Sequence, residues 1–471
     1  MPDTVRDAVQ VRIGRLSPKA RQVLEAGAVL GPVFSFEAAH VTAGRGEIET
    51  IDGLDELVAR QLLLEQATGY CFCHEIVRDA VYRGLGLWRC RLLHRRAEEA
   101  LERLHPDDAA ALAFHFERAE EPGQAARYAL RAGQAAKAVF AHARARACFD
   151  RALTLLEREA VRLWDPEAIA ANQRLQVQAL YERGWALRLL GDMQAYEHDL
   201  PKVKRLAEIL GDAPLLAHLR WREVYTHRWF CRYAEARDVA EEGIRLSQAV
   251  ADRSLEVMCW REVGRAARAT GDYGEAQVAL ERALSLFAGL GDVVHELHAL
   301  SNLSTLFWRL GEHEWAMHLA LRALARCDEA ELPLERRLPL GDVGVAAAAA
   351  GDVDLAWRCL LESLSIARQI ADRTQEIFCL AHLGWLCVQQ KRAVEALEHL
   401  HPALALAKRI DSRAEQSWLH SGLAEAYRLL GDPDRAVEHA RRALELAQAT
   451  GRSHDQRLAQ RVLDELETPD L

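Results

Sequence analysis

The chain contains little lysine, proline or glycine, and its cysteines form no CxxC pair. Its 60 basic residues are overwhelmingly arginine, and lysine occurs only at Lys19, Lys137, Lys202, Lys204, Lys391 and Lys408. With 13 prolines and 28 glycines among 471 residues, long disordered linkers are not expected. Most of the 10 cysteines lie in apolar helical stretches, which is typical of reduced, buried thiols and argues against a disulfide framework.

Other absences argue against whole classes of function. The first residues, MPDTVRDAVQVRIGRL, lack the apolar core of a signal peptide, and no apolar run is long enough to span a bilayer, so we expect a cytoplasmic protein. A net charge of -10 argues against general affinity for nucleic acids. No GxxxxGK[ST] phosphate loop, GxSxG elbow or HExxH pair occurs, so we expect that this chain is not an enzyme and binds no cofactor.

The chain does contain an internal repeat, which its turns reveal. The following turns are separated by whole multiples of 40 residues: Gly191-Asp192, Gly271-Asp272, Gly311-Glu312, Gly351-Asp352 and Gly431-Asp432. Two further members fall at Cys231-Arg232 and Lys391-Arg392, where the turn sequence has drifted, and a second series lies 20 residues later. Glycine ends a helix in the left-handed conformation and aspartate caps the next helix, so each unit should be two helices of about five turns.

Small or slim residues keep the same phase, and they allow the two helices of a pair to approach closely. They are Gly184, Val224, Gly264, Ser304, Gly344, Gly384 and Ala424. We therefore predict an all-α fold in which residues 161–471 form a right-handed superhelix of about seven helix pairs. The spacing and turns resemble tetratricopeptide repeats, which usually run about 34 residues. The longer unit is similar to the sensor superhelix of the maltose-regulon activator and its relatives.

The residues before this array have a different sequence pattern, without the regular 40-residue period. We expect a helical connector over 91–160, with an irregular first helix pair at 123–158, before the segment REAVRLWDPEAIA breaks the period. Residues 1–90 are expected to form a winged-helix domain, with three helices and a small β-hairpin wing. The predicted helices run from Ser17-Pro18 to Val29, from Phe34 to Val41 and from Glu47 to Arg60, and the hairpin joins Leu62–Leu64 to Tyr70–Cys73.

A DNA-binding role for the third helix conflicts with its charge. It carries Glu47, Glu49, Asp52, Asp55 and Glu56 against the single cation of Arg60. Phosphate would repel such a helix, so we expect no direct DNA binding by this chain. A metal site could be imagined from Cys71, Cys73, His74, Cys90 and His94, but their spacing matches no zinc pattern, and we predict no metal.

Three strings in the N-terminal part carry a second resemblance: LSPKARQVLEAGAVLG, LLLEQATGYCFCHEIVRDAVYRGL and RCRLLHRRAEEAL. They are similar to the winged-helix segment of STAND ATPases, the signal-transduction ATPases with numerous domains, in which an ATPase domain, a winged helix and a helical-repeat sensor follow one another. The resemblance implies that a histidine at the end of the wing, here His74, contacts the phosphates of ADP bound in the ATPase domain. The alternative is that His74 merely caps the helix that opens at Glu75.

The inner surface of the superhelix is the predicted ligand-binding groove, because first helices line the concave side of such solenoids. The candidate residues are Tyr181, Trp185, Arg188, His218, Trp221, Tyr225, Arg228, Arg261, Arg265, Arg268, His298 and Trp308. Arg188, Arg228 and Arg268 occupy equivalent places in three successive repeats and suggest an anionic ligand. Alternatively, the arginines are ordinary surface residues of an arginine-rich chain and the tryptophans belong to the core between repeats.

These observations together predict a sensor or regulatory fragment of a STAND-type ATPase. The superhelix would bind an inducer, either a small molecule or a protein, and the winged helix would relay binding to an ATPase domain that is absent from this chain. ADP or ATP would then be bound only with that domain, and this chain would be a monomer. The alternative is a stand-alone tetratricopeptide scaffold that binds an acidic peptide or protein partner.

Overall fold

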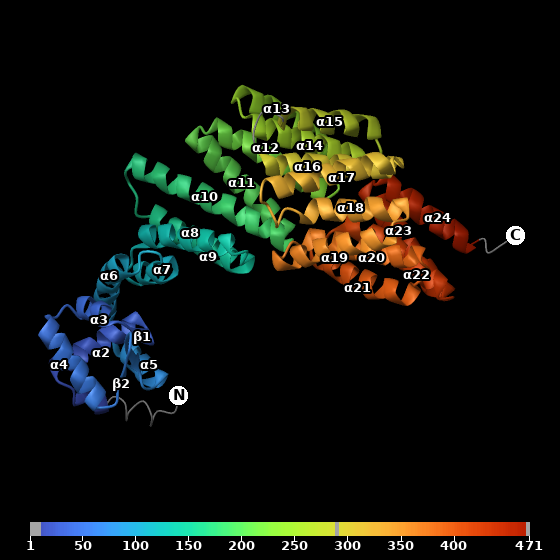
Figure 1. Cartoon of the computed structure of the whole chain (residues 1–471). Helices are drawn as coiled ribbons and strands as arrows, with labels where there is room; N and C mark the ends of the chain where they lie inside the picture. The colour runs from blue at the N-terminus through green and yellow to red at the C-terminus, as the bar shows by residue number, and fades with distance from the viewer. Residues whose placement is uncertain (1–10, 288–291, 468–471) are drawn as a thin grey trace. The chain divides into compact units, whose positions relative to one another are not determined.

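The computed structural model describes residues 11–287 and 292–467, which lie mostly in helices (Figure 1). The chain divides into two compact units, one ending at Arg183 and the other beginning at Gly184. The predicted all-α fold with one small sheet is confirmed. Within these described ranges, no helix is both long and apolar enough to cross a membrane.

The first unit opens with the expected three helices and hairpin. Its elements are α2 (Pro18–Leu30), β1 (Val33–Phe34), α3 (Phe36–Ala43), α4 (Glu47–Ala59), β2 (Leu63–Gln66), β3 (Gly69–Phe72) and α5 (Glu75–Gly84). Ser17 caps α2 as expected, because its Oγ accepts a hydrogen bond from the backbone N–H of Ala20 at 3.2 Å. The sheet has the strand order β1-β3-β2.

The second predicted helix is wrong at its start. Val33 and Phe34 form a strand instead, pairing antiparallel with β3 so that Phe34 lies opposite Tyr70. The helix begins two residues later because Ser35 caps it, with Oγ accepting from the N–H of Ala38 at 3.1 Å. The sequence expectation missed this strand because two residues are too few for an alternating apolar pattern to be visible.

Four helices complete the connector of the first unit: α6 (Leu87–Leu104), α7 (Ala109–Arg118), α8 (Pro122–Ala138) and α9 (His142–Ala160). Helices α8 and α9 are the irregular pair expected at 123–158. Gly133 allows their close contact, since a Cβ atom there would lie 2.4 Å from the ring of Phe149.

The regular array contains the seven expected helix pairs. They are α10 (Pro166–Leu190) with α11 (Met193–Leu210), α12 (Ala213–Trp229) with α13 (Tyr233–Ala249), α14 (Arg253–Thr270) with α15 (Tyr273–Phe287), α16 (Val293–Leu310) with α17 (His313–Glu329), α18 (Arg337–Ala350) with α19 (Val353–Gln369), α20 (Arg373–Gln389) with α21 (Ala393–Arg409), and α22 (Arg413–Leu429) with α23 (Pro433–Thr450). One further helix, α24 (Ser453–Glu467), follows the last pair and was not predicted.

The turns between these helices have the predicted geometry. Gly271 and Gly351 are left-handed, with φ of 93° and 84°, and Asp352 caps α19 by accepting from the N–H of Leu355 at 3.1 Å. The drifted turns keep the same backbone without glycine, because Cys231 and Lys391 both have φ of 60°. Such residues are strained in this region, by roughly 1–2 kcal/mol each.

Small residues hold the helices of a pair together as expected. At Gly264, Gly344 and Gly384 an added Cβ would lie 2.6, 2.7 and 2.5 Å from a leucine Cγ of the second helix. The distances are shorter than any ordinary contact, so a side chain would force the two helices apart. The repeat of small residues therefore sets the spacing within each pair.

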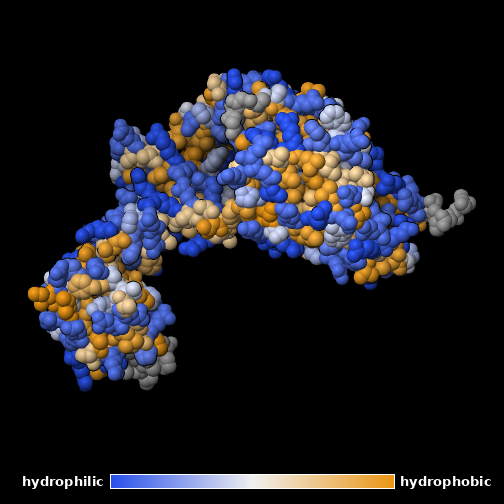
Figure 2. Space-filling view, in the orientation of Figure 1, coloured by the Kyte–Doolittle hydropathy of each residue, from blue (hydrophilic) through white to orange (hydrophobic). Residues whose placement is uncertain are grey.

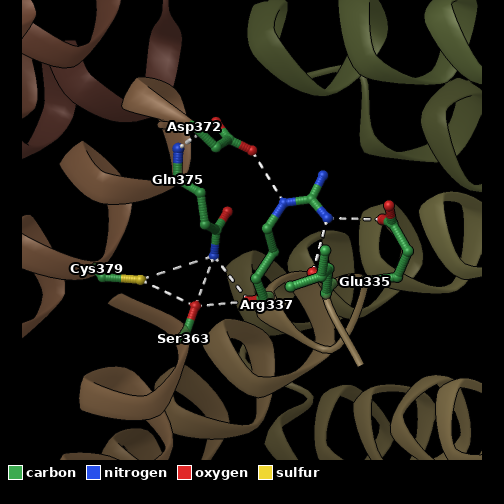
Figure 3. Close-up of polar contacts among 7 residues, drawn as sticks. Glu335, Arg337, Ser363, Asp372, Gln375 and Cys379 are labelled. Carbon is green, nitrogen blue, oxygen red and sulfur yellow. Dashed lines mark hydrogen bonds and ion pairs between the residues drawn. The ribbon is translucent and has the colours of Figure 1, made fainter. Parts of the chain in front are cut away.

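One turn of the array is irregular, and a buried polar cluster stabilises it. Arg337, at the start of α18, donates from Nε to Asp372 Oδ2 at 3.0 Å and from Nη1 to Glu335 Oε2 at 2.7 Å (Figure 3). Gln375 donates to the backbone oxygen of Arg337 at 3.0 Å and to Ser363 Oγ at 3.1 Å. These bonds tie α18 to α19 and α20 where the helix start is delayed.

The last helix of the array closes over its inner side. Helix α24 contacts α14, and Arg457 Nη2 donates to the hydroxyl oxygen of Tyr273 at 3.5 Å. On the face of the superhelix shown in Figure 2, hydrophobic and hydrophilic residues are interspersed, as expected for helices that bury only one side. The inner side between α14 and α24, by contrast, collects charge and aromatic rings.

Candidate ligand-binding site

First helices of neighbouring repeats carry arginines on their inner side. In α14, Arg261, Arg265 and Arg268 follow one another at helical spacing, so they share one face of the helix. Arg228 occupies the place in α12 that Arg268 occupies in α14. We call the following six residues the arginine cluster: Arg228, Arg261, Arg265, Arg268, Arg309 and Arg452.

Glu262 lies inside this cluster, with its side chain 0% exposed. Its Oε2 accepts from Arg228 Nε at 2.7 Å and its Oε1 from Arg265 Nη1 at 3.1 Å, while Arg261 Nη2 lies 3.7 Å away. Burial alone would raise the pKa of Glu262, but these guanidinium groups lower it to about 2. The carboxylate is therefore ionised, and a single negative charge is shared among three cations.

Aromatic rings and a neutral histidine complete the surroundings of this ion-pair network. Arg188 and Arg228 both lie over the ring of Tyr225, at 5.6 and 5.1 Å from its centroid. Arg261 Nη1 lies 3.1 Å from His298 Nδ1. Burial and the charge of Arg261 lower the pKa of His298 well below its usual value, so its ring is neutral and accepts this hydrogen bond.

Arg268 and Arg309 differ from the other members of the arginine cluster. In the part of the chain that the structure describes, neither has a carboxylate within ion-pair distance, although Arg309 lies over the ring of Trp308 at 5.8 Å. Burial lowers the pKa of both, and neighbouring guanidinium groups lower that of Arg268 further. At Arg309 the charge of Arg452 acts in the same direction, while the carboxylates of Asp455 and Glu415 oppose it. Because a guanidinium stays protonated in proteins, both remain cations where positive charge is disfavoured.

These two side chains line a small cavity, which we call the polar cavity. Its volume is about 140 Å³, and its lining includes Arg228, Arg265, Arg268, Arg309, Arg452, Tyr225, Trp229, Tyr233 and Glu415. Two buried donors nearby, Arg265 Nε and Trp229 Nε1, have no hydrogen-bond partner. Each unsatisfied buried donor costs about 1–3 kcal/mol, so an acceptor in this cavity would stabilise the fold.

The turn before α24 supplies the wall opposite α14. Arg452 Nε lies 3.1 Å from Asp455 Oδ2, and Arg452 Nη1 lies 3.9 Å from Glu415 Oε1. These two carboxylates hold the pKa of Arg452 above its usual value despite its burial, and they orient its side chain. The polar cavity is therefore completed by the last helix of the array.

A second cavity adjoins the first, and we call it the aromatic cavity. Its volume is about 410 Å³, and its lining includes Trp308, Val345, Ala348, His382, Trp385, Trp418, His454 and Arg457. The rings of Trp385 and Trp418 are nearly parallel, with centroids 6.2 Å apart, and His382 lies 4.5 Å from Trp418. His454 lines both cavities, so the two cavities lie on either side of this residue.

The structure brings most of the predicted groove residues together. Arg228, Arg261 and Arg265 contact Glu262, while His298 contacts Arg261 and Tyr225 contacts Arg228. Arg268 lines the polar cavity and Trp308 the aromatic cavity. The ring centroid of Trp221 lies 6.3 Å from that of Tyr225, with the two rings tilted by 40°, and His218 Nε2 lies 3.2 Å from Asp252 Oδ2. Trp185 and Arg188 are half-buried on α10, whereas Tyr181 belongs to the first unit.

The site residues that sequence reasoning missed include Glu262, Arg309, Arg452 and His454. Trp308 stands at the place equivalent to Arg268, so Arg309 is displaced by one position from the ladder. Arg452 and His454 lie beyond the last repeat, where the pattern of the array ends. The Gly451-Arg452 turn, 20 residues after Gly431, was the signal that could have found α24.

The N-terminal candidates lie in the first unit. His74 is exposed at the N-cap position of α5, but its side chain makes no capping hydrogen bond, so the alternative role as a helix cap is not supported. His94 contacts Tyr82 and His115 instead of a cysteine cluster. Among residues 11–287 and 292–467, no group of three or more His, Cys, Asp or Glu side chains is arranged to hold a metal ion.

Comparison with known sequences identifies one part of the array. The tetratricopeptide repeat family matches residues 387–449. The chain is also similar to regulatory protein AfsR of Streptomyces griseus, with 24% identity over 251 residues that cover 52% of this chain and 25% of AfsR. It therefore spans about a quarter of the length of this curated relative.

Comparison with solved structures finds further helical-repeat proteins. A STAND protein with a tetratricopeptide repeat sensor from Pyrococcus horikoshii is 13% identical, with a TM-score of 0.49 and coverage of 96% of this chain and 65% of that one. A Rap protein complexed with competence and sporulation factor is 11% identical, with a TM-score of 0.48 and coverage of 73% and 97%. NprR in complex with its cognate peptide NprX is 15% identical, with a TM-score of 0.46 and coverage of 68% and 94%.

Proposed function

We propose that this chain is the sensor part of a signal-transduction regulator, and that its superhelix binds an anionic inducer within the arginine cluster. One observation carries this proposal. Arg268 and Arg309 are cations with no carboxylate within ion-pair distance in the described part of the chain, and they line the polar cavity. Similarity to regulatory protein AfsR supports the regulatory role.

An anion is the natural partner of such a site on energetic grounds. The like charges of Arg265, Arg268 and Arg309 repel one another in a partly buried setting, where a low effective dielectric strengthens every interaction. A carboxylate or phosphate group between these arginines would offset their repulsion. Its oxygens would also accept hydrogen bonds from buried donors that have no partner. Guanidinium groups bind both anions in bidentate geometry.

The first unit is the proposed relay of the sensor. Its helix, strand, helix, helix, strand, strand order supports the proposed winged helix, and four acidic residues, Glu47, Glu49, Asp52 and Asp55, are exposed on α4. The proposed partner of this unit is therefore an ATPase domain rather than DNA. The exposed ring of His74, at the end of the hairpin, is available for the phosphates of ADP bound there. The chain itself is proposed to be a cytoplasmic monomer without catalytic activity.

Protein stability in the presence of anions tests the inducer site. A ligand of the folded state raises stability by about 2.7 kcal/mol at 100 times its dissociation constant. Inorganic phosphate, pyrophosphate and a hexapeptide of glutamate serve as probes, and we expect at least one of them to raise the melting temperature. The double variant Arg268→Ala/Arg309→Ala should lose this effect, whereas Arg282→Ala, which removes an exposed arginine of α15, should keep it.

The outcomes distinguish the candidate functions. A response to the glutamate peptide alone would favour the acidic-peptide scaffold over a small-molecule sensor. An equal response in the wild-type chain and the double variant would place anion binding elsewhere and contradict the proposed site. No response to any of the three probes would contradict an anionic inducer.

A further inference from the structure

The polar cavity carries a net positive charge. Five arginines line it, and three carboxylates, those of Glu262, Glu415 and Asp455, lie within ion-pair distance of them in the described part of the chain. Two positive charges are therefore unbalanced. Two further arginines add positive charge beside the cavity. Arg261 lies near Glu262, which is already counted, and Arg188 acts on Arg261 as a further like charge.

One more carboxyl group lies near this charge without lining the cavity. Asp342 interacts electrostatically with Arg268, but burial raises its pKa to about 7, so it carries less than a full negative charge at neutral pH. The excess positive charge thus remains above one. A dianionic group fits it better than a carboxylate does, and a phosphate monoester is such a group at neutral pH, with a charge of about -1.5 to -2.

The size of the polar cavity agrees with this chemistry. Its volume of about 140 Å³ is close to that of an engineered cavity in another protein, about 150 Å³, which binds one benzene molecule. It therefore has room for one phosphoryl group with its four oxygens, but not for a folded peptide segment. The remainder of any larger ligand has to lie outside this cavity.

The aromatic cavity is the space into which the remainder would extend. It adjoins the polar cavity at His454, and Trp308 and Arg309 are consecutive residues of α16 that face one cavity each. Its lining is mainly apolar, with Trp385 and Trp418 presenting nearly parallel rings. Flat rings of this kind favour a flat apolar or aromatic group through stacking.

We propose that the two cavities together bind one phosphate monoester that carries a flat aromatic group. The phosphoryl oxygens accept from Arg268, Arg309 and Arg452, and the ring lies against Trp308, Trp385 and Trp418. This inference rests on the proposed sensor function and names the class of its inducer. Arg452 immediately precedes α24 and His454 lies in its first turn. Such a ligand therefore bridges the third, fourth, sixth and seventh helix pairs to the last helix of the array.

Calorimetric titration of the full chain with matched probes tests this assignment. The probes are inorganic phosphate, 1-naphthyl phosphate and 1-naphthyl sulfate, which has the same ring but a single negative charge. We expect 1-naphthyl phosphate to bind at least about tenfold more tightly than either of the others, which corresponds to about 1.4 kcal/mol. Hydrogen exchange should show increased protection of α24 in its presence.

Variants separate the two halves of the ligand. Arg268→Ala should abolish binding of both phosphates, whereas Trp385→Ala should remove only the advantage of the naphthyl ring. Trp385→Phe, which keeps a flat ring, should restore part of that advantage and controls for folding. Trp315→Ala, at a tryptophan of α17 that is 58% exposed, should change nothing.

Failure of the inference and failure of the proposed function give different results. Equal affinity for inorganic and naphthyl phosphate, unchanged by Trp385→Ala, would overturn the aromatic half while leaving an anion sensor intact. Equal affinity for naphthyl sulfate and naphthyl phosphate would overturn the inference that the site prefers a group with two negative charges. If neither phosphate nor the glutamate peptide binds, the proposed function itself fails.

Discussion

Arg228 and Glu262 form an ion pair between neighbouring repeats, with Arg228 Nε 2.7 Å from Glu262 Oε2. The carboxylate has no contact with solvent and holds Arg265 as well. A buried charge of this kind is costly to remove from one side only, because the partners are left uncompensated. The pair therefore joins the second and third helix pairs and orients the arginines that face the polar cavity.

Glu262→Gln should destabilise the chain by about 3–5 kcal/mol, since three guanidinium groups lose their shared counter-charge. Inorganic phosphate should restore part of this loss by replacing the missing charge. Urea unfolding with and without phosphate measures both effects. Glu395→Gln, in an exposed ion pair with Arg392, is the matched control and should cost less than about 1 kcal/mol. Equal stability of the two variants would show that the cluster does not depend on its central carboxylate.

Asp342→Asn should make stability less dependent on pH. Burial raises the pKa of Asp342 to about 7, against about 3.9 for an unfolded aspartate, so the folded chain holds the proton between these values. Its contribution is therefore fully present below about pH 4 and is lost as the pH rises through 7. Asparagine is neutral throughout, so the variant should match the wild type at about pH 3.5, below both pKa values, and melt a few degrees higher at pH 8. The same difference in melting temperature between variant and wild type at both pH values would contradict a raised pKa of Asp342.

Lys391→Gly should stabilise the superhelix. Lys391 is exposed and has φ of 60° at the drifted turn between α20 and α21. Glycine relieves this strain, and we expect a gain of about 1 kcal/mol and a melting temperature about 2 °C higher. Lys408→Gly places glycine within α21 instead and should lose about 1 kcal/mol. A loss in both variants would mean that the turn is not strained.

Gly384→Ala should weaken the sixth helix pair. The new Cβ would lie 2.5 Å from Leu400 Cγ, and overpacking of this kind costs about 1–3 kcal/mol. Gly274→Ala is the opposite case, because its Cβ would meet only Asp272 Oδ1 at 3.9 Å and alanine favours the helix by up to about 1 kcal/mol. Thermal unfolding of the two variants should therefore shift in opposite directions. A shift in the same direction would indicate that the helix pair tolerates a wider spacing.

The repeat was predictable from sequence because turn residues and packing residues are dictated by local geometry. Gly351 and Asp352 specify a helix end and a helix start, and Gly384 marks a contact that admits no side chain. The strand at Val33 and Phe34 was not predictable, since only its partner β3 makes it a strand. The delayed start of α18 was missed as well, because it depends on Arg337 and residues of two later helices.

The site was predictable only where it follows the period of the repeat. Arg228 and Arg268 stand at equivalent places, so their common direction could be inferred from spacing. The place of Glu262 is acidic in two other repeats, at Glu182 and Asp342, and is Arg222, Asn302, His382 and Gly422 in the rest, so the period did not mark it. The role of Glu262 depends on which guanidinium groups reach it. Arg452 enters the cavity because α24 packs across the array against α14, a contact between segments far apart in sequence.

The central claim is that the arginine cluster binds an anion inside the superhelix. The most direct measurement is an anomalous difference map from a crystal of the full chain soaked in tungstate, a tetrahedral dianion that resembles phosphate. We predict the strongest peak in the polar cavity, within hydrogen-bond distance of Arg268 and Arg309, and its loss in Arg268→Ala/Arg309→Ala. Tungstate peaks found only on the outer surface, with the polar cavity empty, would contradict the account.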